Sequence, residues 1–319
     1  MDYKTINIII PYFGTFPNYF QLFLNSCKCN NTVDWTIITD NTEKYDYPNN
    51  VRVKKMSFFD VQSLIRSKFD FEVVIDSVHK LCEFKPAYGY IFDELIEGYD
   101  YWGYGDLDII YGDIRKFITE DILSYDKVFT LGHLSLIKNT EGLNKLFMCP
   151  LEGRVLYREA FSSDANFNFD EEFMGKPNIN TIFRSNGYQV CDKSFAADIY
   201  TKSTDFILDV GDGKIENKKK SIFVWEKGNL KRIIKDANAV RTEEYLYIHL
   251  QKRKMKVYID SEASSYKIIP NAFDSLEYSQ EKIFEHFDKI KRKHINNQYL
   301  RIRVKNLKTK IRLKIKLIN

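Results

Sequence analysis

The sequence contains few cysteines and no long apolar run. Only 5 of the 319 residues are cysteine, none of them forms a Cys-x-x-Cys pair, and they are scattered as Cys27, Cys29, Cys82, Cys149 and Cys191. This spacing excludes a disulfide scaffold and favours reduced thiols in a cytoplasm. Apolar runs such as Ile8 to Ile10 are far shorter than the roughly 18 residues that cross a bilayer. We therefore expect neither a transmembrane helix nor a signal peptide.

Several common enzyme and nucleic-acid motifs are also missing. There is no Gly-rich Walker loop, no Gly-x-Ser-x-Gly elbow and no His-Glu-x-x-His, which excludes the usual ATPases, esterases and zincins. No helix-turn-helix, RNP or zinc motif indicates nucleic-acid binding. The chain does have 44% apolar and 29% charged residues. That composition is enough for the core of one large or two small domains of a soluble protein.

Basic residues collect at the C-terminal end. Residues 289–319 contain twelve Lys or Arg and no Asp or Glu, whereas the first 288 residues carry 36 basic and 44 acidic groups. On a helix, the apolar residues of this tail form one stripe: Leu300, Val304, Leu307, Ile311, Ile315 and Ile318. Such a helix is typical of binding to an anionic membrane surface. A helix docked on the body, a nucleic-acid arm and an edge strand over residues 311–317 are the alternatives.

The first fifty residues predict a βαβ unit. Residues 6–10 and 35–41 are apolar strands that end at polar turns, and residues 18–27 between them have helical spacing. A third strand over 51–56 and a helix over 59–69 continue the α/β pattern. In open parallel sheets, ligands bind at the carboxyl ends of the strands, so we expect nucleotide contacts from Pro11, Tyr12 and Asp40.

Two carboxylates follow an aromatic strand in the middle of the chain. After a short helix over residues 90–97, the segment 99–113 places Asp106 and Asp108 at positions i and i+2. In an extended backbone both side chains face the same side and can bind one cation. Oxygen ligands suit Mg²⁺ or Mn²⁺, and such an ion usually neutralises a diphosphate during bond cleavage. Two surface carboxylates in a loop are the alternative.

A later segment offers an imidazole and two cations. Residues 244–253 predict a strand with alternating apolar residues on one face. His249, on the other face, is a candidate third metal ligand, and Lys252 and Arg253 are candidate donors to phosphate oxygens. A hydrogen-bonded structural histidine is the alternative.

Taken together, these motifs resemble a glycosyltransferase of the GT-A type. The set of Lys85-Pro86-Ala87-Tyr88-Gly89, residues 105–113 and residues 249–253 is similar to a family of bacterial proteins encoded with capsule and other surface-polysaccharide genes. The resemblance covers residues 5–255. It implies a Rossmann-like α/β domain, with a mixed and mostly parallel sheet flanked by helices, that binds a nucleotide sugar. In it, Asp106, Asp108 and His249 would hold Mn²⁺ or Mg²⁺, and Asp106, Lys85, Lys252 and Arg253 would contact the nucleotide.

The resemblance also implies roles for residues between these motifs. Residues 130–139 look like the strand that follows the metal motif and lines the sugar site, with His133 and Asn139 as sugar contacts. In an inverting enzyme, Asp170, Glu171 or Glu172 would be the general base that deprotonates the acceptor hydroxyl. A retaining enzyme needs no such base, and a late metal-binding His, as in glycogenin-like enzymes, favours retention. The alternative for the acidic run is that it caps or precedes a helix.

We therefore expect a catalytic domain over residues 1–255 and a C-terminal extension over residues 256–319, with a helix at 284–293 and the basic tail at 289–319. The expected reaction moves a hexosyl unit from a nucleotide sugar, by resemblance a UDP-sugar, to a lipid-linked or oligosaccharide acceptor. The tail would make the enzyme peripheral at the inner face of the cell membrane. Nucleic acid is not an expected partner.

Two other classes of protein share some of these features. A haloacid-dehalogenase-like phosphatase or a nucleotidyltransferase would also use the Asp106 and Asp108 pair. The phosphatase motif fits poorly, however, because Tyr104-Gly105 precede the first Asp where an apolar run is required. A non-catalytic protein that binds membrane surfaces through its basic tail is the remaining alternative.

Overall fold

The computed structural model describes residues 3–211, 214–216, 220–235, 239–251, 253–277, 282–290, 295 and 297–316. The chain divides into two compact units, each made of several chain segments. Unit 1 consists of Met1–Phe16, Cys27–Leu107 and Ile114–Ser194. Unit 2 consists of Pro17–Ser26, Asp108–Asp113 and Phe195–Asn319. The expected functional division at residue 255 stays a prediction.

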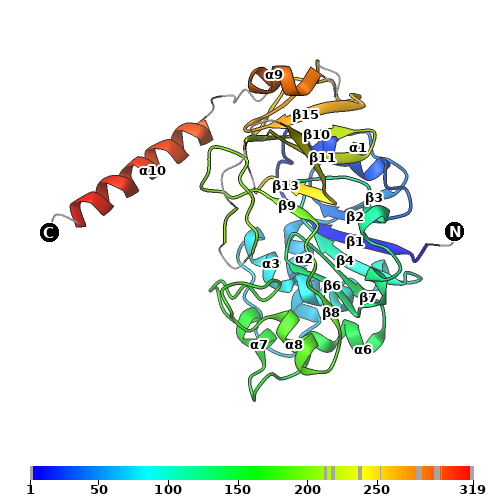
Figure 1. Ribbon diagram of the computed structural model, residues 1–319. Helices are drawn as coiled ribbons and strands as arrows, with labels where there is room; N and C mark the ends of the chain where they lie inside the picture. Colours follow the sequence, from blue (N-terminus) through cyan, green and yellow to red (C-terminus); the bar gives the residue numbers. More distant parts are fainter. Residues whose placement is uncertain are drawn as a thin grey trace. The chain divides into compact units, whose positions relative to one another are not determined.

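Unit 1 is built on a seven-stranded sheet in the order β3-β2-β1-β4-β7-β6-β8 (Figure 1). Four of its six strand pairs are parallel, and the two antiparallel pairs both involve β7. The expected mixed α/β class with a mostly parallel sheet is therefore confirmed. The strands are β1 (Ile6–Pro11), β2 (Asp34–Thr39), β3 (Val51–Lys55), β4 (Tyr101–Gly105), β6 (Lys127–Leu131), β7 (Leu134–Lys138) and β8 (Val190–Cys191). The helices are α2 (Phe58–Ser67), α3 (Leu81–Phe84), α4 (Tyr88–Ile91), α5 (Ile114–Phe117), α6 (Glu141–Asn144), α7 (Leu156–Phe161) and α8 (Ile179–Ser185).

The local sequence explains the first elements of this unit. Strand β1 contains four isoleucines that are buried on both faces, as parallel strands covered on both sides require. Helix α2 begins at a capping box, in which the Ser57 hydroxyl accepts from Asp60 N at 3.1 Å and the Asp60 carboxylate accepts from Ser57 N at 2.9 Å. The strands predicted at 6–10, 35–41 and 51–56 and the helix predicted at 59–69 are confirmed, with small differences at their ends.

Unit 2 contains a six-stranded sheet in the order β12-β11-β10-β15-β16-β14 and a three-stranded sheet in the order β5-β13-β9. The small sheet joins β5, from the middle of the chain, to two strands from its C-terminal part. Helix α1, which the sequence predicts at residues 18–27, begins in this unit. The elements are α1 (Phe20–Lys28), β5 (Ile109–Tyr111), β9 (Ala196–Asp198), β10 (Lys220–Glu226), β11 (Asn229–Lys235), β12 (Val240–Glu244), β13 (Tyr247–His249), β14 (Lys256–Val257), β15 (Ser265–Ile269), β16 (Ala272–Asp274), α9 (Ile283–Ile290) and α10 (Asn297–Lys316).

Apolar packing joins these pieces of unit 2. Helix α9 buries Ile283 and Phe287 in one cluster with Ile222 and Ile233 of the large sheet. In α1, the Phe23 ring lies 6.0 Å from the Tyr111 ring of β5, measured between centroids. Segments that are distant in the sequence therefore pack against one another in this unit.

The structure corrects three expectations about the central motifs. Residues 106–108 form a bend between β4 and β5, so the alternation of an extended strand does not apply to Asp106 and Asp108. Residues 130–139 belong to the β6–β7 hairpin, whose turn contains Gly132 and His133. Residues 244–253 are not one strand, because β12 ends at Glu244 and β13 begins at Tyr247.

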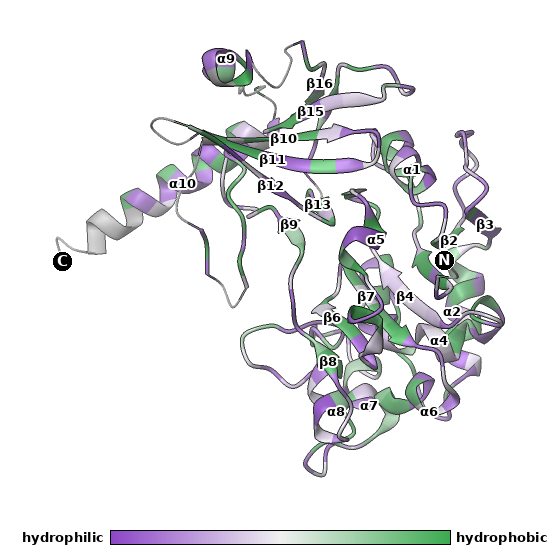
Figure 2. Cartoon of the chain, turned by 45° about the vertical axis from the view of Figure 1, so that its right-hand side comes forward, coloured by the Kyte–Doolittle hydropathy of each residue, from purple (hydrophilic) through white to green (hydrophobic). Residues whose placement is uncertain are grey.

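Residues 297–316 of the basic tail are helical in the structure. Helix α10 runs from Asn297 to Lys316, which excludes the edge strand considered for residues 311–317 over its described part. Hydrophilic and hydrophobic residues follow one another along α10 (Figure 2). The side chains of residues 312–316 and all of residues 317–319 lie outside the described part, and they include Ile315 and Ile318 of the predicted stripe. Among the described helices, none has the length and apolar character that crossing a membrane requires.

Candidate active site

Strand register in unit 2 brings an imidazole between two carboxylates. In the small sheet, His249 of β13 is paired with Asp198 of β9 on one side and with Ile109 of β5 on the other. Asp108 immediately precedes β5, and its carbonyl accepts a hydrogen bond from Leu250 N at 2.8 Å. Three separate segments of the chain thus converge on His249.

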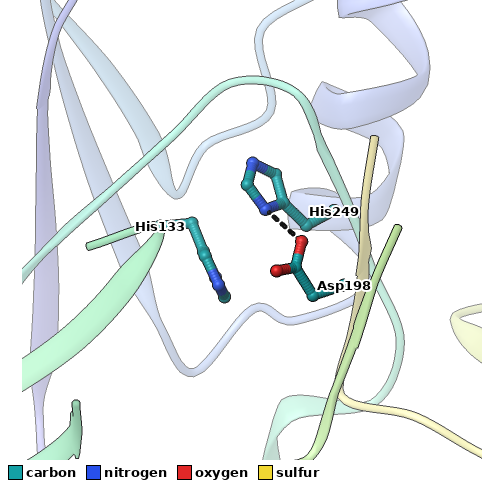
Figure 3. Close-up of side chains that lie close together, drawn as sticks. All are labelled: His133, Asp198 and His249. Carbon is teal, nitrogen blue, oxygen red and sulfur yellow. Dashed lines mark hydrogen bonds and ion pairs between the residues drawn. The ribbon is translucent and has the colours of Figure 1, made fainter. Parts of the chain in front are cut away.

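The side chains of Asp198 and Asp108 also contact the His249 ring. His249 Nδ1 lies 2.9 Å from Asp198 Oδ1, which Figure 3 shows as a dashed line, and His249 Nε2 lies 3.3 Å from Asp108 Oδ1. Gln251 Nε2 donates a second hydrogen bond to Asp198 Oδ1 at 2.7 Å. His249 and Asp108 are buried, with 6% and 8% of their surface exposed. These contacts form an Asp–His–Asp relay, defined by Asp108, His249 and Asp198.

The electrostatics of the relay follow from its two carboxylates. Burial alone lowers the pKa of His249, but the charge and hydrogen bond of Asp108 and those of Asp198 outweigh it and raise the pKa to about 10. The site is therefore built to hold positive charge. Two carboxylates against one imidazole favour positive charge there, as a proton on the ring or as a divalent cation at Nε2.

The donor types in the relay fit Mn²⁺ or Mg²⁺ with one nitrogen ligand. A metal-binding histidine nearly always gives its other ring nitrogen to a carboxylate, which fixes the ring and its tautomer. Asp198 does this for Nδ1 and leaves Nε2 toward the Asp108 carboxylate. Sequence reasoning missed Asp198 because only the β9–β13 pairing brings it to His249. No local pattern around it signals that role.

In unit 1, Lys85 is the centre of a second charged cluster. Its Nζ lies 2.8 Å from Asp106 Oδ1, 2.9 Å from the Gly132 carbonyl and 3.8 Å from Asp170 Oδ2. Burial lowers the pKa of Lys85, but Asp106 and the other neighbours outweigh it and raise it well above its ordinary value. Lys85 is therefore a fixed cation. It ties Asp106 to the β6–β7 turn and to the acidic segment.

Asp170 is the titratable member of this cluster. Burial raises its pKa to about 8, although the Lys85 ammonium opposes the shift. The side chain lies against Gly132, because a Cβ added there would be 2.3 Å from Asp170 Oδ2. Glu171 also contacts this turn, by accepting a hydrogen bond from Gly132 N at 3.2 Å. Position 132 therefore requires glycine for the close approach of the acidic segment.

A buried glutamate fixes the approach of that segment. Glu83 Oε1 accepts from Phe167 N at 2.7 Å and Asn168 N at 3.1 Å, and Glu83 Oε2 accepts from Phe169 N at 2.9 Å. Three backbone donors on one carboxylate hold the residues directly before Asp170. The acidic run does not cap a helix, because α8 begins later and its N-cap is Asn178.

Three other predicted site residues make hydrogen bonds or a salt bridge within their own unit. The Asn139 amide donates to the Ile96 and Tyr99 carbonyls, and Glu172 pairs with Arg184 at 2.5 Å. Arg253 is 2% exposed and donates to the Ser203 carbonyl and to Asn271 Oδ1.

The remaining predicted residues lie on the loops. The Asp40 carboxylate accepts from Gly14 N at 3.1 Å, so the loops after β1 and β2 lie side by side. Tyr12 donates to the Thr15 carbonyl, and Pro11 ends β1. The His133 carbonyl accepts from Asp106 N at 3.2 Å. Lys252 lies outside the described residues.

Comparison with known proteins adds a family and weak structural similarities. A family of unknown function, DUF6625, matches residues 8–277. The chain is similar to a galactosyltransferase, LgtC, solved in complex with donor and acceptor sugar analogs, at 10% identity and a TM-score of 0.34, over 60% of this chain and 75% of that chain. An active-site mutant of LgtC gives the same values. No curated protein matches the sequence. Because similarity at this TM-score carries no argument about activity, the function rests on the residues themselves.

Proposed function

We propose that this chain, which belongs to the family of unknown function DUF6625, is a metal-dependent glycosyltransferase of the GT-A type. It would move a hexosyl unit from a nucleotide sugar, with UDP as the favoured nucleotide, to an oligosaccharide or a lipid-linked saccharide. The observation that carries the proposal is the Asp108–His249–Asp198 relay, which offers a carboxylate and an oriented imidazole to one cation.

In this proposal, Asp108 and His249 hold Mn²⁺ or Mg²⁺, and Asp198 orients the His249 ring through its contact with Nδ1. Asp106 belongs to unit 1, and its place as a further ligand rests on the Asp-x-Asp spacing, two residues before Asp108 in the chain. When bound, the ion supplies charge that stabilises a leaving diphosphate. Lys252 remains a proposed donor to the phosphates. Arg253 is less suited to that role, since its guanidinium is already bonded inside unit 2.

Lys85 and Asp170 are the proposed groups of unit 1. Lys85 holds the Asp106 carboxylate in position through a 2.8 Å contact. Asp170, with its pKa raised to about 8, holds or releases a proton near neutral pH, which suits a group that contacts a sugar hydroxyl. Among the three candidate acids, we favour Asp170 over Glu172 because Glu172 already pairs with Arg184.

The stereochemistry, location and pathway are proposals that rest on the resemblance in the sequence. A late histidine in a sequence that also contains an Asp-x-Asp motif, as in glycogenin-like enzymes, supports retention of the anomeric configuration. A soluble nucleotide-sugar donor supports work in the cytoplasm. The neighbouring capsule genes of the similar proteins support a role in bacterial surface polysaccharides.

The first experiment measures hydrolysis of a panel of UDP-hexoses by the purified full-length chain. We expect one donor to be cleaved only with Mn²⁺ or Mg²⁺, and EDTA to abolish the cleavage. Asp198→Asn keeps the shape of the side chain but not its charge, and we expect it to weaken metal-dependent activity by roughly 10- to 100-fold. Added Mn²⁺ should restore part of that loss. An unchanged metal titration in this variant would contradict the role of the relay.

One control variant and two contrary outcomes complete the test. Asp192→Asn changes an exposed aspartate and should behave as the wild type. Release of inorganic phosphate from sugar phosphates, without any nucleotide sugar, would instead support the phosphatase. Full donor hydrolysis in excess EDTA would overturn a metal-dependent transferase.

A further inference from the structure

Helix α10 exposes an apolar stripe that no described residue of its own unit covers. Leu300, Val304, Leu307 and Ile311 are 52%, 52%, 59% and 49% exposed. At about 100° per residue they fall within an arc of about 60° on the helix surface. Four large apolar side chains in one row are thus presented to solvent, which is unusual for a helix that only covers a core.

The contacts that hold α10 to unit 2 lie on another side of the helix. Asn306 Nδ2 donates to the Lys202 carbonyl at 3.3 Å, and the partly buried Tyr299 and Ile302 lie on the same side as Asn306. This side is centred about 130° away from the apolar stripe. The exposed fractions therefore show that α10 does not contact unit 2 through the stripe.

Basic residues flank the stripe on both edges. Arg301 and Lys308 lie on one edge, Arg303 and Lys310 lie on the other, and α10 contains no acidic residue. The first 288 residues have eight more acidic than basic groups, so positive charge is concentrated in the tail. An apolar row between two basic rows matches a surface that is apolar inside and anionic outside.

We propose that α10 is an interfacial helix that binds anionic phospholipid, with Leu300, Val304, Leu307 and Ile311 in the acyl boundary and the flanking basic residues at the headgroups. Charge complementarity selects this occupant. A second copy of α10 would bring two basic helices together, which repel. A nucleic acid would pair with the charges but leave the apolar row in water. The inference does not depend on the proposed enzymatic activity.

The test is sedimentation of the full-length chain with vesicles. We expect binding to vesicles of phosphatidylcholine mixed with phosphatidylglycerol, weak binding to phosphatidylcholine alone, and release from the mixed vesicles by high salt. The variant Val304→Gln with Leu307→Gln removes half of the row but keeps a good helix former at each position. We expect it to bind mixed vesicles about tenfold more weakly.

A matched control and two other readouts make the test decisive. Lys305→Gln with Thr309→Gln changes the side of the helix away from the stripe and should lower binding far less than the stripe variant. No binding of the wild type to mixed vesicles would overturn the proposal. In that case, binding to duplex DNA by both variants would identify nucleic acid as the ligand instead. A wild-type dimer that the stripe variant loses in light scattering would identify a second copy of the chain.

Discussion

At the scale of single residues, burial and neighbouring charge decide what each ionisable group can do. His249 and Lys127 are both buried bases, yet their pKa values move in opposite directions. His249 has two carboxylates against it, so its charged form is stabilised. Lys127 Nζ instead donates to the Phe129 carbonyl at 2.6 Å and to Ser135 Oγ at 3.0 Å, which are neutral partners. Burial therefore lowers the pKa of Lys127 to about 7.

The shift of Lys127 predicts how stability depends on pH. Between the folded pKa of about 7 and the ordinary value of 10.5, the unfolded chain binds more protons at Lys127 than the folded chain. The contribution of Lys127 to the free energy of unfolding should therefore rise with pH in this window, by on the order of 1 kcal/mol per pH unit. Lys127→Met removes this dependence. Urea unfolding of the wild type and of this variant, near neutral pH and about two pH units higher, measures the dependence.

The comparison between the two proteins isolates Lys127 from all other titrating groups. We expect the stability difference to shift in favour of the wild type as the pH rises. Parallel stability curves would mean that Lys127 keeps its charge in the folded chain.

At the scale of elements, the β6–β7 hairpin gathers the groups of unit 1. Its bulge between Val128 and Leu131 and the positive φ of 69° at Phe129 turn backbone carbonyls away from the ladder. Lys127 and Ser135 donate to the Phe129 carbonyl. The turn that follows presents the Gly132 carbonyl to Lys85 and the His133 carbonyl to Asp106 N. The shape of one hairpin thus fixes two of the proposed site residues.

Gly132→Ala is the sharpest probe of this element. The added Cβ would lie 2.3 Å from Asp170 Oδ2, so the acidic segment must move. We expect a loss of about 1–3 kcal/mol in the free energy of unfolding and a loss of donor hydrolysis. Gly142→Ala is the matched control, since nothing lies within 4 Å of its Cβ and it occurs in helix α6. Equal stability and activity of the two variants in urea and hydrolysis assays would contradict the close approach.

At the scale of the whole molecule, each unit takes its parts from several stretches of chain. The small sheet of unit 2 needs β5, residues 109–111, and its core needs α1, which begins near residue 20. Trp225 Nε1 donates to the Tyr111 carbonyl at 2.9 Å, so the large sheet also depends on this mid-chain segment. Unit 2 is therefore not a domain that a single cut can separate.

This connectivity predicts the behaviour of a fragment. Residues 195–319 alone lack β5 and α1, and the partners of Trp225 and His249 in those segments are lost. We expect the fragment to show no cooperative unfolding by circular dichroism in urea. Co-expression with residues 1–194 should recover a folded complex. A cooperative transition of the fragment by itself would show that unit 2 folds without the mid-chain segment.

The sequence alone determined those features that depend on neighbours in the chain. The β-branched run of Ile6 to Ile10 predicts β1, and the spacing of three and four in the tail predicts α10, because periodicity reports local geometry. The residue types of Asp106, Asp108 and His249 were also enough to predict a cation site, a role that stays a prediction for all three residues.

Only the tertiary structure decided which distant groups meet. The pairing of β13 with β9 puts Asp198 against His249, and the close approach at Gly132 brings Asp170 to Lys85. The structure also shows that Asn139 and Arg253 make hydrogen bonds, and Glu172 a salt bridge, within their own units. Strand register and burial are set by contacts between remote segments, and those contacts leave no periodic trace in the local sequence. For that reason the relay became visible only in the folded chain.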